Sequence, residues 1–482
     1  MLAVSDNRVE SFDIADRDQP LRTSNIALAQ YVSKVVGWGD TAVRIGANWY
    51  SSETEVDVTS VAELATPRSS AGLDLAVTSG DTCNSYAYLE QAFARGDNAY
   101  LVYSEYDYSG SEYQERRRLA TLDISDPAAP RVVGESVLKQ TPDQSYYDLT
   151  LPGAGQSALV AGQALVFNHR VVDWSTNTPR TTESGLYVVS LADPAAPSQH
   201  YVELPTGLGI TGLTTDGHIV VRSHYAPSPD DRTRVRFYAD RVDVSDPEHP
   251  VRLGSVNTPG AVIAMRGKRA ITADFWHQVT QGVTAETCYR DYARVLSFEV
   301  PGDSYDYSTT KGTCTALGQT LHLVEIDAAG ATLLGSERLT ADEAISQVAV
   351  GDGVLFATLA NQSGYLYQTG IDCVGCYTLG GSSMRVLSIA GLDSGDFQIG
   401  RLDLDAGADG YWGGLIVASG KRALLTSGWH GQLSLVDAES PTKPRLLRQV
   451  PVNGYVTDLS IIGHTGVASL GYDGVMTVDL SE

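Results

Sequence analysis

A short recurring phrase constrains the fold of this chain more than any other feature of its sequence. Each copy is an alternating apolar segment that ends at Asp, a turn of the form D-P-x-x-P or a close variant, and a second alternating segment. Proline fixes φ and lacks an N–H group, so it suits a turn, and an Asp or Ser side chain can bond the backbone of such a turn. The phrase therefore predicts a β-hairpin. The copies are FDIADRDQPLRTS at 12–24, LDISDPAAPRVVG at 122–134, VSLADPAAPSQHY at 189–201, VDVSDPEHPVRLG at 242–254 and LVDAESPTKPRLL at 435–447.

A second phrase, a Gly or Asp turn followed by an apolar strand, stands upstream of most copies. Joined to the first, it gives strand, turn, strand, loop, strand, turn and strand, which is one four-stranded blade. Blades of roughly 40–50 residues with loop insertions are typical of β-propellers. The second phrase reads GQALVFN at 162–168, DGHIVVRS at 216–223, GKRAITAD at 267–274, GDGVLFAT at 351–358 and SGKRALLTS at 419–427.

The spacing predicts an all-β chain that folds as one propeller domain over residues 1–482. Eight four-stranded blades fit best, and seven are the alternative; degenerate blades are expected near 33–75, 261–338 and 343–405. The C-terminal segment supplies three strands of a blade, and the segment PLRTSNIAL near the N-terminus is of the missing fourth type. We therefore expect strands from both termini to close the ring, because closure removes exposed strand edges.

The D-(I/V)-S-D-P-x-x-P pattern at 122–134 and 242–254 resembles the blade motif of bacterial extracellular propellers of the LVIVD-repeat type. The other copies match this motif more loosely. The resemblance implies a secreted or surface-anchored protein, often part of a longer chain, and it carries over no catalytic residue.

The charge of the chain limits its partners. Its 34 Lys and Arg against 58 Asp and Glu give a formal net charge of −24, so nucleic acid is not an expected partner. No segment has the 18 or more apolar residues of a membrane span, and the first residues lack the basic and apolar regions of a signal peptide. We expect a monomer that is part of a longer precursor and is extracellular, periplasmic or anchored to the outer surface.

The five cysteines predict disulfides rather than a metal centre. Cys288 and Cys314 bracket a single insertion, which favours a disulfide between them. Cys373 and Cys376 form CVGC, which suits a local disulfide or half of a zinc site, but no second pair of ligands lies nearby. Cys83 is left without an assigned partner.

Histidines and aromatic residues follow the second strand of several blades and are therefore expected at one end of the propeller. One hypothesis is a ligand face for glycan, protein or a shared metal ion, since aromatic rings stack on ligands and imidazoles bind metals. The other is that each histidine caps its own hairpin. The candidate ligand-binding residues are His169, His224, Trp276, His277, Trp429 and His430, with Tyr106 in a comparable place; Trp49 and Tyr50 occupy another.

Two further features are candidates for binding. Tyrosine-rich acidic loops at 103–118, 144–149, 302–310 and 363–370 suit recognition, and Arg116, Arg117 and Arg118 are expected to be internal counter-charges. Asp403, Asp405 and Asp409 have a spacing loosely like that of a calcium loop, although the Gly and Glu that define an EF-hand are absent. No cofactor is expected other than this calcium ion, with an ordinary acidic turn as the alternative.

No common hydrolase or nucleotide-binding motif occurs in the sequence. The first functional hypothesis is therefore a non-catalytic recognition or scaffold propeller that binds protein or glycan through one loop face. The alternative is a polysaccharide lyase in which His224, with Tyr225 or His277, abstracts a proton. A third hypothesis is an inert domain of a larger surface protein.

Overall fold

The computed structural model describes most of the chain, and the described residues fall into two compact units. Unit 1 comprises Met1–Leu138, Pro194–Ala196 and Asn453–Glu482, and unit 2 comprises Lys139–Asp193 and Pro197–Val452. The described residues are 1–4, 8–27, 31–47, 53–64, 73–76, 85–107, 114–139, 158–173, 180–207, 209–231, 234–300, 310–359, 383–405, 414–427 and 431–481.

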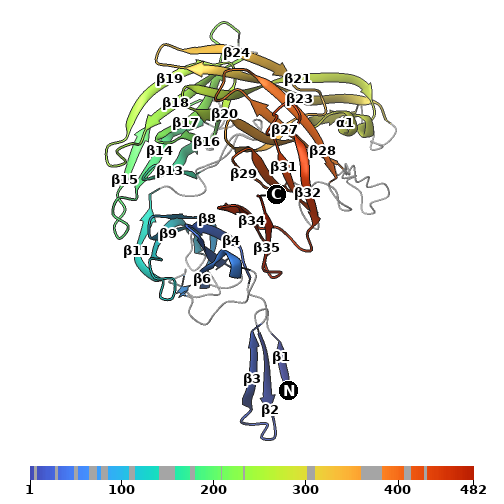
Figure 1. Cartoon of the computed structure of the whole chain (residues 1–482). Coiled ribbons are helices and arrows are strands. Elements are labelled where there is room, and N and C mark those ends of the chain that lie inside the picture. Colours follow the sequence, from blue (N-terminus) through green and yellow to red (C-terminus); the bar gives the residue numbers. More distant parts are fainter. Residues whose placement is uncertain are drawn as a thin grey trace. The chain divides into compact units, whose positions relative to one another are not determined.

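Eight antiparallel sheets follow one another along the chain, and a separate three-stranded sheet precedes them (Figure 1). The eight sheets are the blades of a β-propeller, so the eight-blade prediction is confirmed. In each complete blade the strands pair in chain order, apart from an insertion in the fifth. Among the described residues, no helix is long and apolar enough to cross a membrane.

Unit 1 contains the N-terminal sheet and blades 1, 2 and 8. The N-terminal sheet is β1 (Leu2–Val4), β2 (Arg8–Asp13) and β3 (Leu21–Ala27). Blade 1 is β4 (Lys34–Trp38), β5 (Thr41–Ala47), β6 (Glu53–Ser60) and β7 (Leu73–Ala76), with the 3-10 helix η1 (Val61–Glu63) between the last two. Blade 2 is β8 (Ser85–Arg95), β9 (Asn98–Asp107), β10 (Gln114–Asp123) and β11 (Arg131–Leu138). Blade 8 is β33 (Asp458–Ile462), β34 (Thr465–Ser469) and β35 (Val475–Asp479).

Unit 2 contains blades 3 to 7. Blade 3 is β12 (Ala158–Ala161), β13 (Ala164–Asp173), β14 (Arg180–Ser190) and β15 (Gln199–Glu203); blade 4 is β16 (Gly209–Asp216), β17 (Ile219–Pro227), β18 (Val235–Asp243) and β19 (Val251–Thr258). Blade 5 is β20 (Ala261–Arg266), β21 (Arg269–Val283), β23 (Gly312–Ile326) and β24 (Ala331–Arg338), with β22 (Val295–Glu299) also paired to β23. Blade 6 is β25 (Ile345–Val350), β26 (Val354–Leu359), β27 (Ser383–Ala390) and β28 (Gln398–Asp405); blade 7 is β29 (Ile416–Ser419), β30 (Arg422–Thr426), β31 (Gln432–Asp437) and β32 (Arg445–Pro451).

The repeated phrase forms the predicted hairpin between the third and fourth strands. In blade 2, the Asp123 carboxylate accepts a hydrogen bond from the Ser125 N–H at 3.0 Å, and Asp126 accepts one from the Ala128 N–H at 3.0 Å. The corresponding residues of blade 4 repeat both bonds. A β-bulge follows in the pairing of β10 with β11, between Thr121 and Leu122, and another lies at the same place in blade 4. The phrase thus fixes both the turn and the register of the outer strand.

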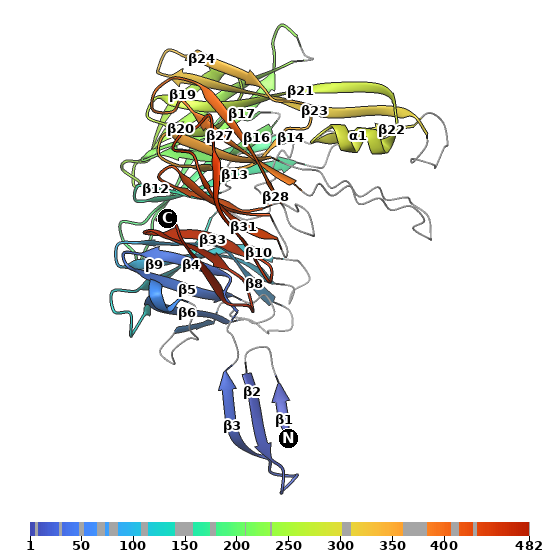
Figure 2. The same cartoon turned by 45° about the vertical axis from the view of Figure 1, so that its right-hand side comes forward.

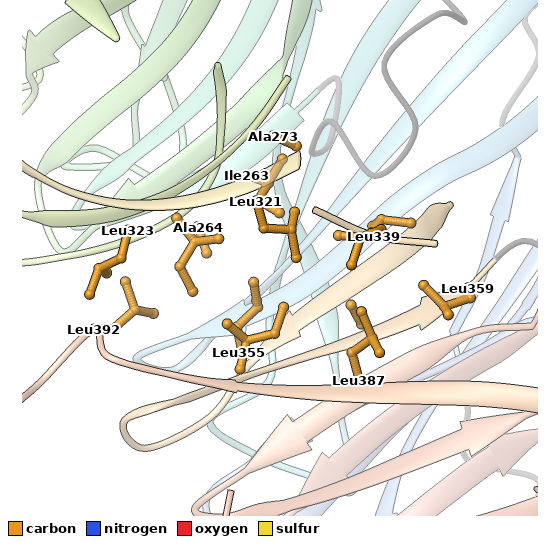
Figure 3. Packing of buried hydrophobic residues seen from close by; sticks show 14 residues of the cluster. Ile263, Ala264, Ala273, Leu321, Leu323, Leu339, Leu355, Leu359, Leu387 and Leu392 are labelled. Atoms are coloured by element: carbon orange, nitrogen blue, oxygen red, sulfur yellow. The ribbon is translucent and has the colours of Figure 1, made fainter. Parts of the chain in front are cut away.

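The apolar core lies between neighbouring blades. Within each unit, the first strands of successive blades contact one another. Figure 3 shows the cluster between blades 5 and 6, where Leu321, Leu323 and Leu355 are fully buried. Complete burial of one such side chain stabilises a fold by roughly 1.5–3 kcal/mol. Packing between neighbouring blades therefore contributes to the stability of each blade.

Blade 5 carries the largest insertion among the described residues. Its strands β21 and β23 each run for 15 residues, and the helix α1 (Ala285–Asp291) lies between them in sequence (Figure 2). A disulfide joins Cys288 of α1 to Cys314 of β23, which confirms the predicted pairing. Cys83, Cys373 and Cys376 lie outside the described residues.

The two ends of the chain meet in unit 1, but not through the expected strand. Val32 and Gly471 form an antiparallel bridge, and β33 contacts β4. The strand expected to complete blade 8, which forms β3, pairs with β2 instead. The reason is that β2 and β3 are joined by one copy of the repeated phrase, so their hairpin forms locally.

An ion pair links the two terminal blades, with Lys34 Nζ 3.4 Å from Asp458 Oδ1. Burial raises the pKa of the Asp458 carboxyl, and the Lys34 ammonium opposes this effect only in part. Because the folded pKa lies above the unfolded one, ionisation of Asp458 lowers the free energy of unfolding as pH rises through this window.

We predict that Lys34→Met lowers the free energy of unfolding by about 1–3 kcal/mol at pH 7, because it leaves the half-buried Asp458 carboxylate without a counter-charge. The deficit should vanish in acid, where Asp458 is protonated in both proteins. Urea unfolding at several pH values between about 4 and 7 measures it. The control is Lys34→Met combined with Asp458→Asn, which should remove this pH dependence; an equal deficit at every pH would contradict the assignment.

Candidate functional site

Three of the candidate histidines, all in the described part of unit 2, lie within their second strands rather than after them. His169 lies on β13, His224 on β17 and His277 on β21, each in the second half of its strand. The strands are longer than predicted because the second and third strands of each blade keep pairing past these positions. His169 and His224 are 3% and 5% exposed, whereas His277 is exposed.

His224 belongs to a buried polar network in blade 4. Its Nδ1 lies 2.9 Å from Oδ2 of Asp240, and the same carboxylate oxygen accepts a hydrogen bond from Arg222 Nη2 at 3.1 Å. The Arg222 guanidinium also donates to Ser184 Oγ of blade 3 at 2.9 Å and to the Pro205 carbonyl at 3.1 Å. Arg222 and Asp240 are both fully buried. The network therefore ties blade 3 to blade 4.

Electrostatics keep the Asp240 carboxyl ionised. Burial raises the pKa of the Asp240 carboxyl, but the hydrogen bond from His224 and the charge of Arg222 outweigh burial, so the pKa lies below its usual range. The second carboxylate oxygen accepts a hydrogen bond from Ser255 Oγ at 2.5 Å. The His224 ring is stacked on Tyr238, with centroids 4.9 Å apart. A carboxylate thus orients the imidazole, as in a general base, but the ring is covered by its own blade.

The suggested pairing of His224 with Tyr225 is not formed. Adjacent residues of a strand point to opposite faces of the sheet. Tyr225 packs in an aromatic cluster with Phe237 and Phe275, at ring-centroid distances of 5.8 and 6.3 Å. The His277 ring lies 6.5 Å from that of Phe275 in its own blade.

His169 lies in an aromatic cluster of blade 3. Its ring meets those of Tyr187 and Tyr201 edge-on, with centroids 5.0 and 5.5 Å away, and its Nε2 lies 3.2 Å from Glu183 Oε2. The Tyr201 ring covers Gly185, where a Cβ would lie 2.6 Å from it. The contacts of His169, like those of the other two histidines, stay within one blade. This arrangement supports the hypothesis that each histidine stabilises its own hairpin.

Trp276 also packs within its blade. Its ring lies over Gly318, where a Cβ would come within 2.2 Å of it, and the Arg338 guanidinium stacks on it at 3.8 Å. Glycine is required at 318 because any side chain would displace the indole. Trp276 therefore holds the second and third strands of blade 5 together at the base of the insertion.

Tyr106 and the arginines of blade 2 are held by acidic partners. Burial and a hydrogen bond with Glu115 raise the pKa of Tyr106 to about 12. Arg117 pairs with Glu90 at 2.7 Å, and Arg118 pairs with Glu135 at 3.0 Å. Arg117 and Arg118 are thus counter-charges within the blade, as predicted.

The structure describes only part of the suggested calcium loop. Asp403 lies on β28 and pairs with Arg385 at 2.6 Å, Asp405 ends the same strand, and Asp409 lies outside the described residues. Within the described residues, no three His, Cys, Asp or Glu side chains come together as metal ligands. Trp49, Tyr50, Trp429 and His430, with most of the tyrosine-rich loops, also fall outside the described part of the chain.

Four tyrosines of unit 1 lie near one another, and the sequence did not predict this. Tyr31 precedes β4, and its ring meets that of Tyr472 edge-on with centroids 4.8 Å apart. Burial raises the pKa of the Tyr31 phenol, and the nearby phenols of Tyr472, Tyr88 and Tyr455 raise it further. Tyr88, Tyr455 and Tyr472 are 58%, 56% and 43% exposed. We call these four residues the tyrosine cluster.

The position of the tyrosine cluster follows from the blade topology. Tyr31 and Tyr455 lie just before the first strands of blades 1 and 8, Tyr472 joins the second and third strands of blade 8, and Tyr88 lies on the first strand of blade 2. Their three blades adjoin through the first strands β33, β4 and β8. Gly471 has a φ of +61°, and a Cβ there would lie 3.0 Å from the Tyr31 ring, so this glycine permits the approach.

The sequence matches no family model and no curated protein. Solved propellers are similar at low identity. BamB from Moraxella catarrhalis is 11% identical over 99% of this chain and 92% of its own, with a TM-score of 0.36. Sqt1 from Chaetomium thermophilum is 11% identical over 94% and 96%, with a TM-score of 0.43. The β-propeller domain of the Trilobed protease from Pyrococcus furiosus is 9% identical over 82% and 96%, with a TM-score of 0.37. These values carry no argument about function.

We predict that Asp240→Asn lowers the free energy of unfolding by about 3–5 kcal/mol, because it leaves the Arg222 guanidinium buried without its counter-ion. Urea unfolding of both proteins measures the difference. Asp230→Asn is the matched control: Asp230 pairs with Arg236 at 2.7 Å but is 82% exposed, so it should cost at most about 1 kcal/mol. Similar costs for the two variants would show that the blade 4 network does not stabilise the fold.

Proposed function

We propose that this chain is a non-catalytic recognition propeller that binds a neutral glycan through the tyrosine cluster. The observation that carries the proposal is the gathering of Tyr31, Tyr88, Tyr455 and Tyr472 from three adjoining blades, with three of the four residues about half exposed. A tyrosine offers a planar apolar face and a hydroxyl on one rigid side chain, which suits stacking on a sugar ring with hydrogen bonds at its edge.

Two properties favour a neutral glycan. The formal charge of −24 disfavours polyanions such as nucleic acids and acidic polysaccharides. The imidazoles of His169 and His224 are buried among partners of their own blades, so they serve packing rather than proton transfer. A binding surface therefore fits the described residues better than a lyase site.

An extracellular or envelope location belongs to the same proposal. The disulfide between Cys288 and Cys314 suits an oxidising compartment. The likeness of the repeated phrase to LVIVD-type propellers supports a secreted or surface-anchored protein of that family.

We predict that Tyr88→Ala and Tyr455→Ala each weaken glycan binding about tenfold, because each removes one stacking face. Affinity electrophoresis in gels that contain β-glucan, galactomannan or dextran measures the binding. Leu333→Ala is the control, since Leu333 lies on β24 and its 56% exposure equals that of Tyr455.

Three results would overturn the proposal. One is the absence of any glycan retardation; another is equal retardation of all three variants. The third is the release of unsaturated products from alginate or polygalacturonate, measured by their ultraviolet absorbance. That outcome would establish the lyase alternative.

A further inference from the structure

Three side chains on one face of blade 5 lie in the order carboxylate, imidazole and hydroxyl. Ser336 Oγ lies 2.7 Å from Nδ1 of His322, and Nε2 of the same ring lies 3.5 Å from Oδ2 of Asp274. His322 is 9% exposed, whereas Ser336 is exposed on the outer strand of the blade. We call these three residues the blade 5 triad. They lie in unit 2, whereas the tyrosine cluster lies in unit 1.

The pairing of the strands brings the blade 5 triad together. His322 of β23 lies opposite both Thr272 of β21 and Ser336 of β24. Asp274 follows Thr272 by two residues, and residues two apart on a strand point to the same face of the sheet. The Asp274 carboxylate therefore reaches the ring of His322 diagonally. Its other oxygen accepts a hydrogen bond from the Thr320 N–H at 3.1 Å, which holds the carboxylate in place.

The same positions of blade 4 hold a structural ion pair instead. There Asp240 lies opposite both Arg222 and Ser255, as His322 lies opposite Thr272 and a serine in blade 5. In both blades a β-bulge follows one residue later, so the positions are equivalent. Blade 5 thus has an imidazole where blade 4 has a carboxylate neutralised by arginine. An imidazole can accept a proton and release it again near neutral pH, which suits proton transfer rather than a static ion pair.

The surroundings of His322 set the direction of proton transfer. A carboxylate only accepts hydrogen bonds, so the neutral ring carries its proton on Nε2, toward Asp274. Nδ1 is then the acceptor for the Ser336 hydroxyl. Nε2 is buried without a hydrogen-bond partner in the described part of the chain, and the carboxylate lies within ion-pair distance of it. Asp274 therefore stabilises the positive charge that the ring gains when it takes the hydroxyl proton.

One backbone N–H is available beside the hydroxyl. The Leu339 N–H donates to the Gln319 carbonyl of β23, and the direction of the N–H groups alternates along an antiparallel strand. The Ser336 N–H therefore points away from β23, toward the outer edge of the blade. A serine hydrolase aims more than one donor at the oxyanion. A single donor thus suits attack on an activated acyl group, but it disfavours repeated turnover.

Arg338 adds a positive charge on the same face. It follows Ser336 by two residues on β24 and is exposed, and its guanidinium stacks on the Trp276 ring. Arg338 has no acidic partner among the residues that the structure describes. In a chain with a net charge of −24, such an arginine favours the approach of an anionic reagent to this face.

We propose that Ser336 is a covalent modification site that accepts one acyl group from an activated ester bearing a negative charge. The bond from Ser336 Oγ to the acyl carbon forms as the bond from that carbon to the leaving oxygen breaks, and His322 carries the hydroxyl proton to the leaving group. The products are an O-acylserine and the free alcohol or phenol. Asp274 is a positioning residue. The reaction consumes the site once, so it adds no turnover to a recognition propeller.

Two p-nitrophenyl esters test the proposal on the full chain, the neutral acetate and the mono-succinate with its free carboxylate. We expect a burst of about one equivalent of nitrophenolate per chain, as for an acyl-enzyme that accumulates. Peptide mapping by mass spectrometry should place the acyl group on Ser336. The succinate ester should react faster than the acetate, and Arg338→Gln should remove this preference.

Variants of the blade 5 triad assign the roles. Ser336→Ala should abolish the burst, and His322→Gln should slow it about 100-fold because the general base is lost. Asp274→Asn should also slow the burst, and Asp274→Glu should restore part of the rate. Thermal unfolding checks that each variant is folded. Acid supplies a readout that needs no variant: a protonated imidazole cannot accept the hydroxyl proton, so the burst should slow as the pH falls below neutrality.

Ser255 is the matched control within the chain, because it occupies the equivalent position but donates to the Asp240 carboxylate at 2.5 Å. Acylation of Ser255 as fast as that of Ser336 would overturn the proposal, and so would an unmodified Ser336 in the folded chain. Sustained release of nitrophenolate that requires Ser336 would also overturn it, because the site would then be catalytic. Tyr88→Ala should leave the burst unchanged, so this proposal and glycan binding can fail separately.

Discussion

The turn between the third and fourth strands is the constraint on which the rest of each complete repeat depends. Asp123 and Asp126 each accept a hydrogen bond from the backbone N–H two residues further on, and the prolines prevent the strand from continuing. The bulge one residue earlier then sets which outer residues face the next blade. Because a slip of one residue would reverse the two faces of the sheet, this local geometry protects the packing between blades.

Buried ion pairs between the second and third strands make the arrangement of those strands more specific. Arg44 and Asp57 in blade 1 lie opposite each other on the second and third strands, as Arg222 and Asp240 do in blade 4. Each arginine also donates to a backbone carbonyl outside its strand pair, that of Leu64 in blade 1. Such pairs add little net stability, but breaking one is costly, so they favour a single arrangement of the strands and loops.

The repeat predicted much of the fold because its signals are local. The eight blades, the hairpin turns and the disulfide between Cys288 and Cys314 follow from turn residues and spacing within a blade or one insertion. The partners of Trp276 were missed for a different reason. Its packing needs the absence of a side chain at Gly318, and nothing in the sequence relates those two positions before the strands are paired.

The candidate site was harder to predict because its residues come from opposite ends of the chain. Histidines at equivalent places in successive blades suggested convergence, yet long second strands keep each one among partners of its own blade. Tyr31 and Tyr472 show no shared motif, and they meet only because the first and last blades adjoin. The bridge between Val32 and Gly471 joins the same two blades and fixes the chain on either side of these rings.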